Sequence, residues 1–174
     1  MPIARSAFCI FCDDIRQEVG NKFSFMGVYS GDMTFPVIPP AQLSKFCIAA
    51  WLISPVGDAP QSIAISIFTP PGKTEFVRIA PEGPPPSHPT TEGMQRLITQ
   101  FLVPITGLPI SEDGFIEVEI ETERETLRAG RIKVQFAPPP LPTTEGLTEP
   151  TPSDPTASPP PSELSPSAAP ASES

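Results

Sequence analysis

Apolar residues recur at every second position along most of the chain, and a period of two is the period of β-strands. In residues 62–68 isoleucine fills alternate positions, and in residues 115–121 isoleucine and valine alternate with glutamate. Segments of this kind turn one face towards a core and leave the other to solvent or to a neighbouring element. Most of the chain is therefore expected to fold as β-sheet.

Five further segments have the composition or the alternation of strands. They cover residues 6–12, 23–29, 45–53, 74–79 and 127–136. Residues 23–29 are apolar on both faces, which favours a central strand. Gly20-Asn21, just before them, favours a tight hairpin turn because glycine adopts positive φ at little cost.

Residues 94–104 fit two structures. Leu97, Ile98 and Phe101 have helical spacing, but Leu97, Phe101 and Val103 also fit one face of a strand. We expect a strand because the segments on either side are strands. Seven or eight short strands separated by turn residues predict an all-β fold, an antiparallel immunoglobulin-like β-sandwich.

Proline divides the chain into two parts. Of the 27 prolines in 174 residues, twelve lie in residues 138–174, with five acidic residues and no lysine, arginine or aromatic residue. A segment so poor in large apolar groups cannot offset the entropy cost of ordering. We expect residues 1–137 to form the β-sandwich domain and residues 138–174 a disordered Pro/Ser/Thr/Glu-rich tail. Its Pro-x-x-Pro sequences lack a basic anchor, which favours a solubilising spacer over an SH3-type ligand.

The charge of the chain excludes several partners. Eleven basic residues face 20 acidic ones, and no cluster of lysine or arginine is present. Nucleic-acid binding needs such a cluster to neutralise phosphates. No apolar run approaches the ~20 residues of a membrane span, and the start of the chain has no extended apolar segment of a signal peptide. We expect a cytoplasmic protein that binds neither nucleic acid nor membrane.

Two consecutive stretches resemble a known family. They are Cys-Asp-Asp-Ile-Arg-Gln-Glu at residues 12–18 and Gly-Asn-Lys-Phe-Ser-Phe-Met-Gly-Val-Tyr at residues 20–29. They are similar to the opening of small bacterial proteins that are catalogued only as a domain of unknown function, and Gly-Phe-Ile at residues 114–116 also fits. Asn21 stands between the glycine and lysine that adjoin in the family pattern. The resemblance spans roughly residues 6–136 and implies a cytosolic immunoglobulin-like sandwich with no assigned activity.

The densest polar group beside apolar segments is Asp13, Asp14, Arg16 and Glu18. Several carboxylates together are the ligands that hard cations such as calcium prefer, and they also serve in acid/base chemistry. However, Asp14, Arg16 and Glu18 alternate, so in an extended strand they share a face and can pair with one another. We favour the structural ion pair. Asp13, Asp14 and Glu18 stay as weak candidates for a metal or ligand site.

Cys9 and Cys12 form a Cys-x-x-Cys pair. In redox proteins such a pair lies at a helix N-terminus, whereas on a strand this spacing points the two sulfurs to opposite faces. A zinc site would need further ligands, and only Cys47 and His88 remain. We expect buried cysteines without disulfides, and we expect Trp51 in the core.

Five glutamates alternate along an acidic stripe. They are Glu117, Glu119, Glu121, Glu123 and Glu125. The following segment supplies four basic residues that can form ion pairs with these glutamates across neighbouring strands. They are Arg124, Arg128, Arg131 and Lys133. We favour a self-complementary solvated face over an acidic docking surface.

The sequence contains no catalytic constellation. His88 stands alone in a proline-rich loop, and no nucleophile elbow, phosphate loop or dinucleotide fingerprint occurs. No catalytic residue, cofactor or metal is expected. The leading hypothesis is a non-catalytic interaction or assembly module that binds a protein partner. The alternative is a small enzyme or a metal- or ligand-binding protein using Asp13, Asp14 and Glu18.

Overall fold

A computed structural model describes residues 4–83 and 93–137. These residues form ten strands and a short 3-10 turn. They are β1 (Ser6–Cys12), β2 (Asp14–Glu18), β3 (Lys22–Met26), β4 (Met33–Phe35), β5 (Ala41–Pro55), η1 (Val56–Asp58), β6 (Ile63–Thr69), β7 (Thr74–Ile79), β8 (Arg96–Ile110), β9 (Gly114–Thr122) and β10 (Thr126–Phe136). The predicted all-β fold is confirmed, with more strands than the seven or eight expected.

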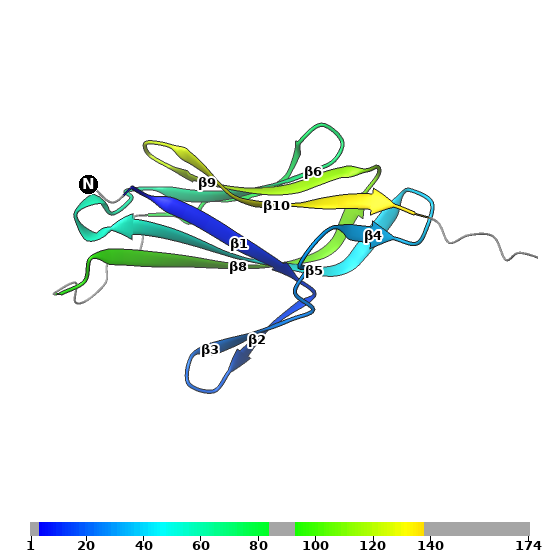
Figure 1. Cartoon of the computed structure of the whole chain (residues 1–174). Helices are drawn as coiled ribbons and strands as arrows, with labels where there is room; N and C mark the ends of the chain where they lie inside the picture. Colours follow the sequence, from blue (N-terminus) through cyan, green and yellow to red (C-terminus); the bar gives the residue numbers. More distant parts are fainter. Residues whose placement is uncertain (1–3, 84–92, 138–174) are drawn as a thin grey trace, which may run out of the picture. The chain divides into compact units, whose positions relative to one another are not determined.

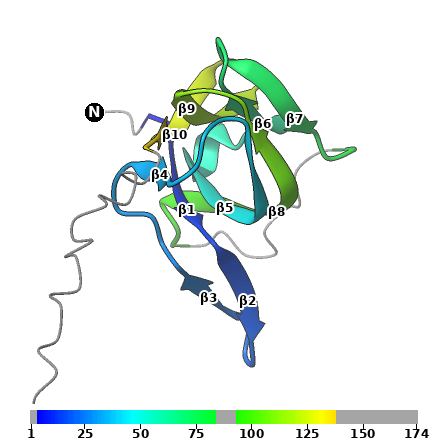
Figure 2. The same cartoon turned by 90° about the vertical axis from the view of Figure 1, so that its right-hand side faces the viewer.

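Eight of the strands form two sheets. One has the order β1-β5-β8 and the other β4-β10-β9-β6-β7, and they lie face to face (Figure 1). The remaining strands, β2 and β3, form a separate hairpin that projects from the three-stranded sheet (Figure 2). All neighbouring strands are antiparallel except β4 and β10, which pair in parallel over three residues of each strand.

The core lies between the two sheets and is built by alternate residues of each strand. On β9, Ile116, Val118 and Ile120 are fully buried, which confirms the inward face predicted for this segment. Ile48 and Leu52 of β5 enter the same cluster from the opposite sheet. Burying a side chain of this size contributes roughly 1.5–3 kcal/mol, so the alternation itself holds the sheets together.

Residues 94–104 fall largely in β8, so the strand predicted there is confirmed. β8 and β5 both contain 15 residues and pair along almost their whole length. A helix at residues 94–104 would leave the backbone N–H and C=O groups along this edge of β5 without hydrogen-bond partners. Pairing with β5 therefore favours the strand.

The prediction that residues 23–29 form a central strand is wrong. The strand there is β3, which pairs only with β2, and Gly20 and Asn21 (φ 83° and 56°) form the turn of that hairpin. β1 pairs with β5 instead. The apolar residues on the two faces of β3 have different surroundings. Phe23 and Phe25 are half-buried, whereas Met26 on the other face is exposed.

A buried arginine joins the start of β1 to the opposite sheet. The Arg5 guanidinium donates to Glu123 Oε1 at 2.8 Å, to Thr122 Oγ1 at 3.1 Å and to the Asp58 carbonyl at 3.1 and 3.2 Å. Only 1% of its side chain is exposed. A buried charge must be paired and hydrogen-bonded, and these acceptors meet both conditions.

Within residues 4–83 and 93–137, no helix is long and apolar enough to cross a membrane. His88 and the predicted tail, residues 138–174, lie outside the described residues.

Candidate functional site: an apolar face beside the hairpin

The outer face of the three-stranded sheet is mostly apolar around its middle. Residues in register across neighbouring strands share a side of the sheet, and positions two apart along a strand do so too. The core-facing residues of β5 are Ile48, Ala50 and Leu52, so the residues between them point outwards. The apolar outward side chains around the middle of this sheet form what we call the apolar face: Phe8, Ile10, Trp51, Ile53, Ile98 and Leu102. The exposed polar residue Gln100 lies among them, opposite Trp51.

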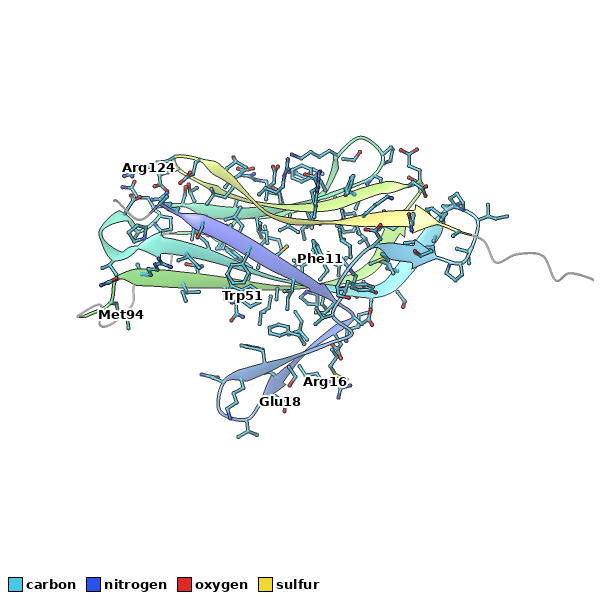
Figure 3. The ribbon with its side chains drawn as sticks, in the orientation of Figure 1. Phe11, Arg16, Glu18, Trp51, Met94 and Arg124 are labelled. Carbon is cyan, nitrogen blue, oxygen red and sulfur yellow. The ribbon has the colours of Figure 1, made fainter. Side chains whose placement is uncertain are left out.

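Aromatic packing organises this face around Trp51. The Phe8 ring stacks on Trp51 with centroids 4.9 Å apart and an interplanar angle of 13°, and Phe25 of the hairpin meets Trp51 edge-on at 5.9 Å. Figure 3 shows Trp51 on the side of the three-stranded sheet from which the hairpin projects. Phe8 is 45% exposed and Ile98 is 57% exposed. The expectation that Trp51 lies in the core is wrong: its side chain is half-buried on the outer face.

The hairpin covers one end of the same sheet. In its register Ile15 lies opposite Phe25 and Gln17 opposite Phe23, so these residues share the face that meets Trp51. Cys47 and Ala49 are outward on β5 and yet fully or almost fully buried, as expected beneath a cover. An isolated two-stranded hairpin is marginally stable in water, so this contact is what orders it.

The polar residues of the hairpin are engaged in separate contacts. Asp14 accepts from Lys45 Nζ at 2.5 Å and from Arg16 Nε at 3.3 Å, and the Lys45 hydrogen bond lowers the pKa of Asp14. Asp13 accepts a 2.6 Å hydrogen bond from the Tyr29 hydroxyl. Burial, together with this bond, raises the pKa of Tyr29.

Glu18 is not brought to this cluster. It accepts from the Ser24 hydroxyl at 3.0 Å and lies four positions along β2 from Asp14, about 13 Å at strand spacing. Among the residues that the structure describes, no group of three or more His, Cys, Asp or Glu side chains could hold a metal ion. Asp13, Asp14 and Glu18 therefore do not converge on a shared point.

The cysteines lie on two sides of the three-stranded sheet. Cys9 packs towards the core, whereas Cys12 lies opposite Cys47 under the hairpin, and all three are free. Burial raises the pKa of Cys9 to about 12 and that of Cys12 to about 11. The thiolate is the reactive form, so at neutral pH these side chains act as apolar groups.

Two glutamates of the acidic stripe pair with basic residues in and beside β7, a pairing that the sequence did not suggest. Arg128 of β10 lies 3.4 Å from Glu117, as expected, but Lys73 and Arg78, in and beside β7, pair with the next two glutamates. β7 is the edge strand beside β6, so a local pattern in β9 and β10 could not reveal it.

The rest of the predicted stripe is used elsewhere. Glu123 follows the end of β9 and binds Arg5, and Arg124 pairs with Asp58. Arg131 lies over the Phe115 ring at 4.6 Å, and Lys133 is 3.9 Å from Asp32. Arg124 also lies 3.6 Å from Glu123, so its predicted pairing with the stripe is confirmed, whereas the pairing predicted for Arg131 and Lys133 is wrong.

Residues 7–135 match the model of a family described as a family of unknown function (DUF6941). No match was found among curated proteins or among solved structures. The matched region runs from β1 to β10 and so takes in both sheets and the hairpin. The chain therefore belongs to this family of unknown function, as its opening residues led us to expect.

Proposed function

We propose that this chain is a non-catalytic interaction module of the bacterial cytoplasm that binds a protein partner through the apolar face. The observation that carries the proposal is the exposure of Phe8 and Ile98 beside the half-buried Trp51. Contiguous exposed apolar side chains with an aromatic centre are typical of protein interfaces, where tryptophan and tyrosine often dominate the binding energy.

The surroundings of the apolar face support the same proposal. The hairpin stands beside it and presents Ile15, Phe23 and Phe25 on the side that meets Trp51. The charged side chains of the hairpin, Asp14, Arg16 and Glu18, lie on its other face, as a polar rim would. An apolar centre with polar residues at its edge is the usual anatomy of such a surface.

The test uses the full chain with an affinity tag, expressed in its native cell. Phe8→Ser combined with Ile98→Ser removes the exposed part of the apolar face without touching the core. Ile38→Ser is the matched control, because Ile38 is 76% exposed and lies in the loop between β4 and β5. We expect a partner to be retained by the wild type and by Ile38→Ser, and to be lost from the double variant.

Two results would contradict the proposal. One is the same set of retained proteins for all three chains, since the face would then make no difference. The other is no retained protein with any chain after chemical cross-linking in the cell.

A further inference from the structure

The two sheets meet along a seam where strand edges are left open. β1 pairs only with β5, and β10 pairs with β4 only over residues 134–136. The neighbouring edges of β1 and β10 touch at Gly130, where a Cβ atom would lie 2.6 Å from Cys9 Sγ. Beyond this contact, towards the end of β1, the structure leaves a cavity between the strands.

The cavity has a volume of about 360 Å³. Its walls are residues 9–11 of β1, residues 29–32 of the loop before β4, and residues 130–133 of β10, with Phe115 of β9. Cavities that hold small ligands in proteins usually measure roughly 300–1,000 Å³, with mostly apolar walls and a few polar groups. This cavity falls within that range, and its polar groups decide what it can bind.

Two cations lie along one wall. Arg131 and Lys133 are two positions apart on β10, so their side chains leave the same face of the strand about 7 Å from each other. Among the described residues, no carboxylate lies within 4.0 Å of Arg131, and Lys133 has only the loose 3.9 Å contact with Asp32. The β10 wall is thus positive in a chain with a net charge of −9, and Asp32 of the loop before β4 brings one carboxylate to the same cavity.

The opposite wall adds a main-chain donor. The Phe11 carbonyl accepts from Tyr29 N at 2.9 Å, so the Phe11 main chain is turned away from β5. In an antiparallel strand the N–H and C=O of one residue point to the same side, so the Phe11 N–H also faces the seam. Phe115 provides an apolar surface beneath the Arg131 guanidinium.

We propose that the seam cavity is a binding site for a small dicarboxylate with a chain of four to six carbons. One carboxylate takes the planar fork of Arg131, which suits two parallel hydrogen bonds. The second carboxylate takes Lys133, and the roughly 7 Å between the points where the two side chains leave β10 sets the scale of the ligand's length. The methylene groups between the carboxylates lie against the Phe115 side of the cavity. This site is separate from the apolar face.

The test is a titration of the full chain with glutarate, followed by the amide resonances of Gly31 and Gly130, both in the cavity wall. We expect saturable shifts at these amides. Butyrate, which has one carboxylate, is expected to bind about tenfold or more weakly, because a charged hydrogen bond is lost. Inorganic phosphate is the second comparison and is expected to bind more weakly than glutarate, because it cannot span both cations.

Three variants of the full chain complete the test. Arg131→Ala and Lys133→Ala are each expected to weaken glutarate binding about tenfold or more. Arg128→Ala is the matched control: it removes the same charge from the same strand, but Arg128 pairs with Glu117 and does not line the cavity. The absence of saturable shifts, equal binding of phosphate and glutarate, or equal loss in all three variants would each overturn the assignment. The same spectra show whether each variant is folded.

Discussion

At the scale of single residues, the most consequential side chain is Arg5, whose role no local sequence pattern indicates. Arg5 precedes β1 and yet binds groups from η1 and from the end of β9. Its partner Glu123 has its pKa lowered to about 2, chiefly by the hydrogen bond from Arg5. The folded state therefore holds the charged form of Glu123 more strongly than the unfolded chain does.

This pKa predicts a pH dependence of stability. A carboxyl group whose pKa falls on folding stabilises the protein above its ordinary pKa, here 4.5, and this contribution is lost as the pH falls towards about 2. We expect Glu123→Gln to be less stable than the wild type at pH 7, with the difference shrinking between about pH 5 and pH 2. Urea unfolding across this pH range measures it.

The matched control for this pH dependence is Glu125→Gln, two residues along the same turn. It should follow the wild-type profile. A constant difference between wild type and Glu123→Gln from pH 7 to pH 2 would contradict the role given to the Arg5 contact.

Glycine is required at position 130 because the surrounding atoms leave no room for a side chain. An added Cβ would meet Cys9 Sγ at 2.6 Å and the Phe11 ring at 3.8 Å. We expect Gly130→Ala to lower the free energy of unfolding by about 1–3 kcal/mol, the usual cost of overpacking.

The double variant Cys9→Ala/Gly130→Ala checks this cause. Removing the sulfur makes room for the methyl group, so the two changes together should cost less than the sum of the single changes, as a double-mutant cycle would show. Additive losses would mean that the contact with Cys9 is not what excludes a side chain at Gly130.

At the scale of elements, the hairpin is the part that the sequence misplaced. Its composition identified a strand and its turn correctly, and the alternation predicted β6, β7, β9 and β10 closely. An apolar pattern on both faces does not distinguish a central strand from a hairpin that covers another sheet, because both bury two faces in part. Only the long-range pairing of β1 with β5 separates them.

The candidate site was hidden for the same reason. β5 is apolar on both sides from Phe46 to Ile53, which reads as a strand in the interior. In the fold, one side is core and the other is the partly exposed apolar face. How much of the outer side of β5 is exposed depends on how far the hairpin extends over it. No local pattern in the sequence of β5 contains that information.

The contact between hairpin and sheet can be tested through Trp51, the single tryptophan of the chain. We expect Phe25→Ala to move the Trp51 fluorescence to longer wavelength, because the ring that meets it edge-on is removed. The loss of global stability should be about 1–2 kcal/mol, less than the ~3–5 kcal/mol of a fully buried phenylalanine. Hydrogen exchange should quicken most at residues 14–26.

Phe76→Ala is the control, because Phe76 is the same residue type, lies on β7 in the other sheet and is 38% exposed. It should leave the Trp51 emission unchanged. Unaltered emission in Phe25→Ala would mean that the hairpin does not rest on the sheet in solution.

At the scale of the whole molecule, composition predicts where the folded part ends. The last strand, β10, ends at Phe136, and residues 138–174 contain twelve prolines and no aromatic residue. We expect a chain shortened to residues 1–137 to unfold at the same temperature as the full chain, within about 2 °C, as measured by circular dichroism. A shift of about 4–8 °C would correspond to ~1 kcal/mol and would show that the tail stabilises the domain.

The parallel pairing of β4 with β10 has a consequence for synthesis. Residues 33–35 find their partners only at residues 134–136, so the five-stranded sheet is not completed until nearly the last residue of the domain has left the ribosome. At about 5–20 residues per second, β4 waits for roughly 5–20 s. During that time its edge, and much of the apolar surface of the earlier strands, is open to chaperones. The domain therefore closes after translation of β10 rather than strand by strand.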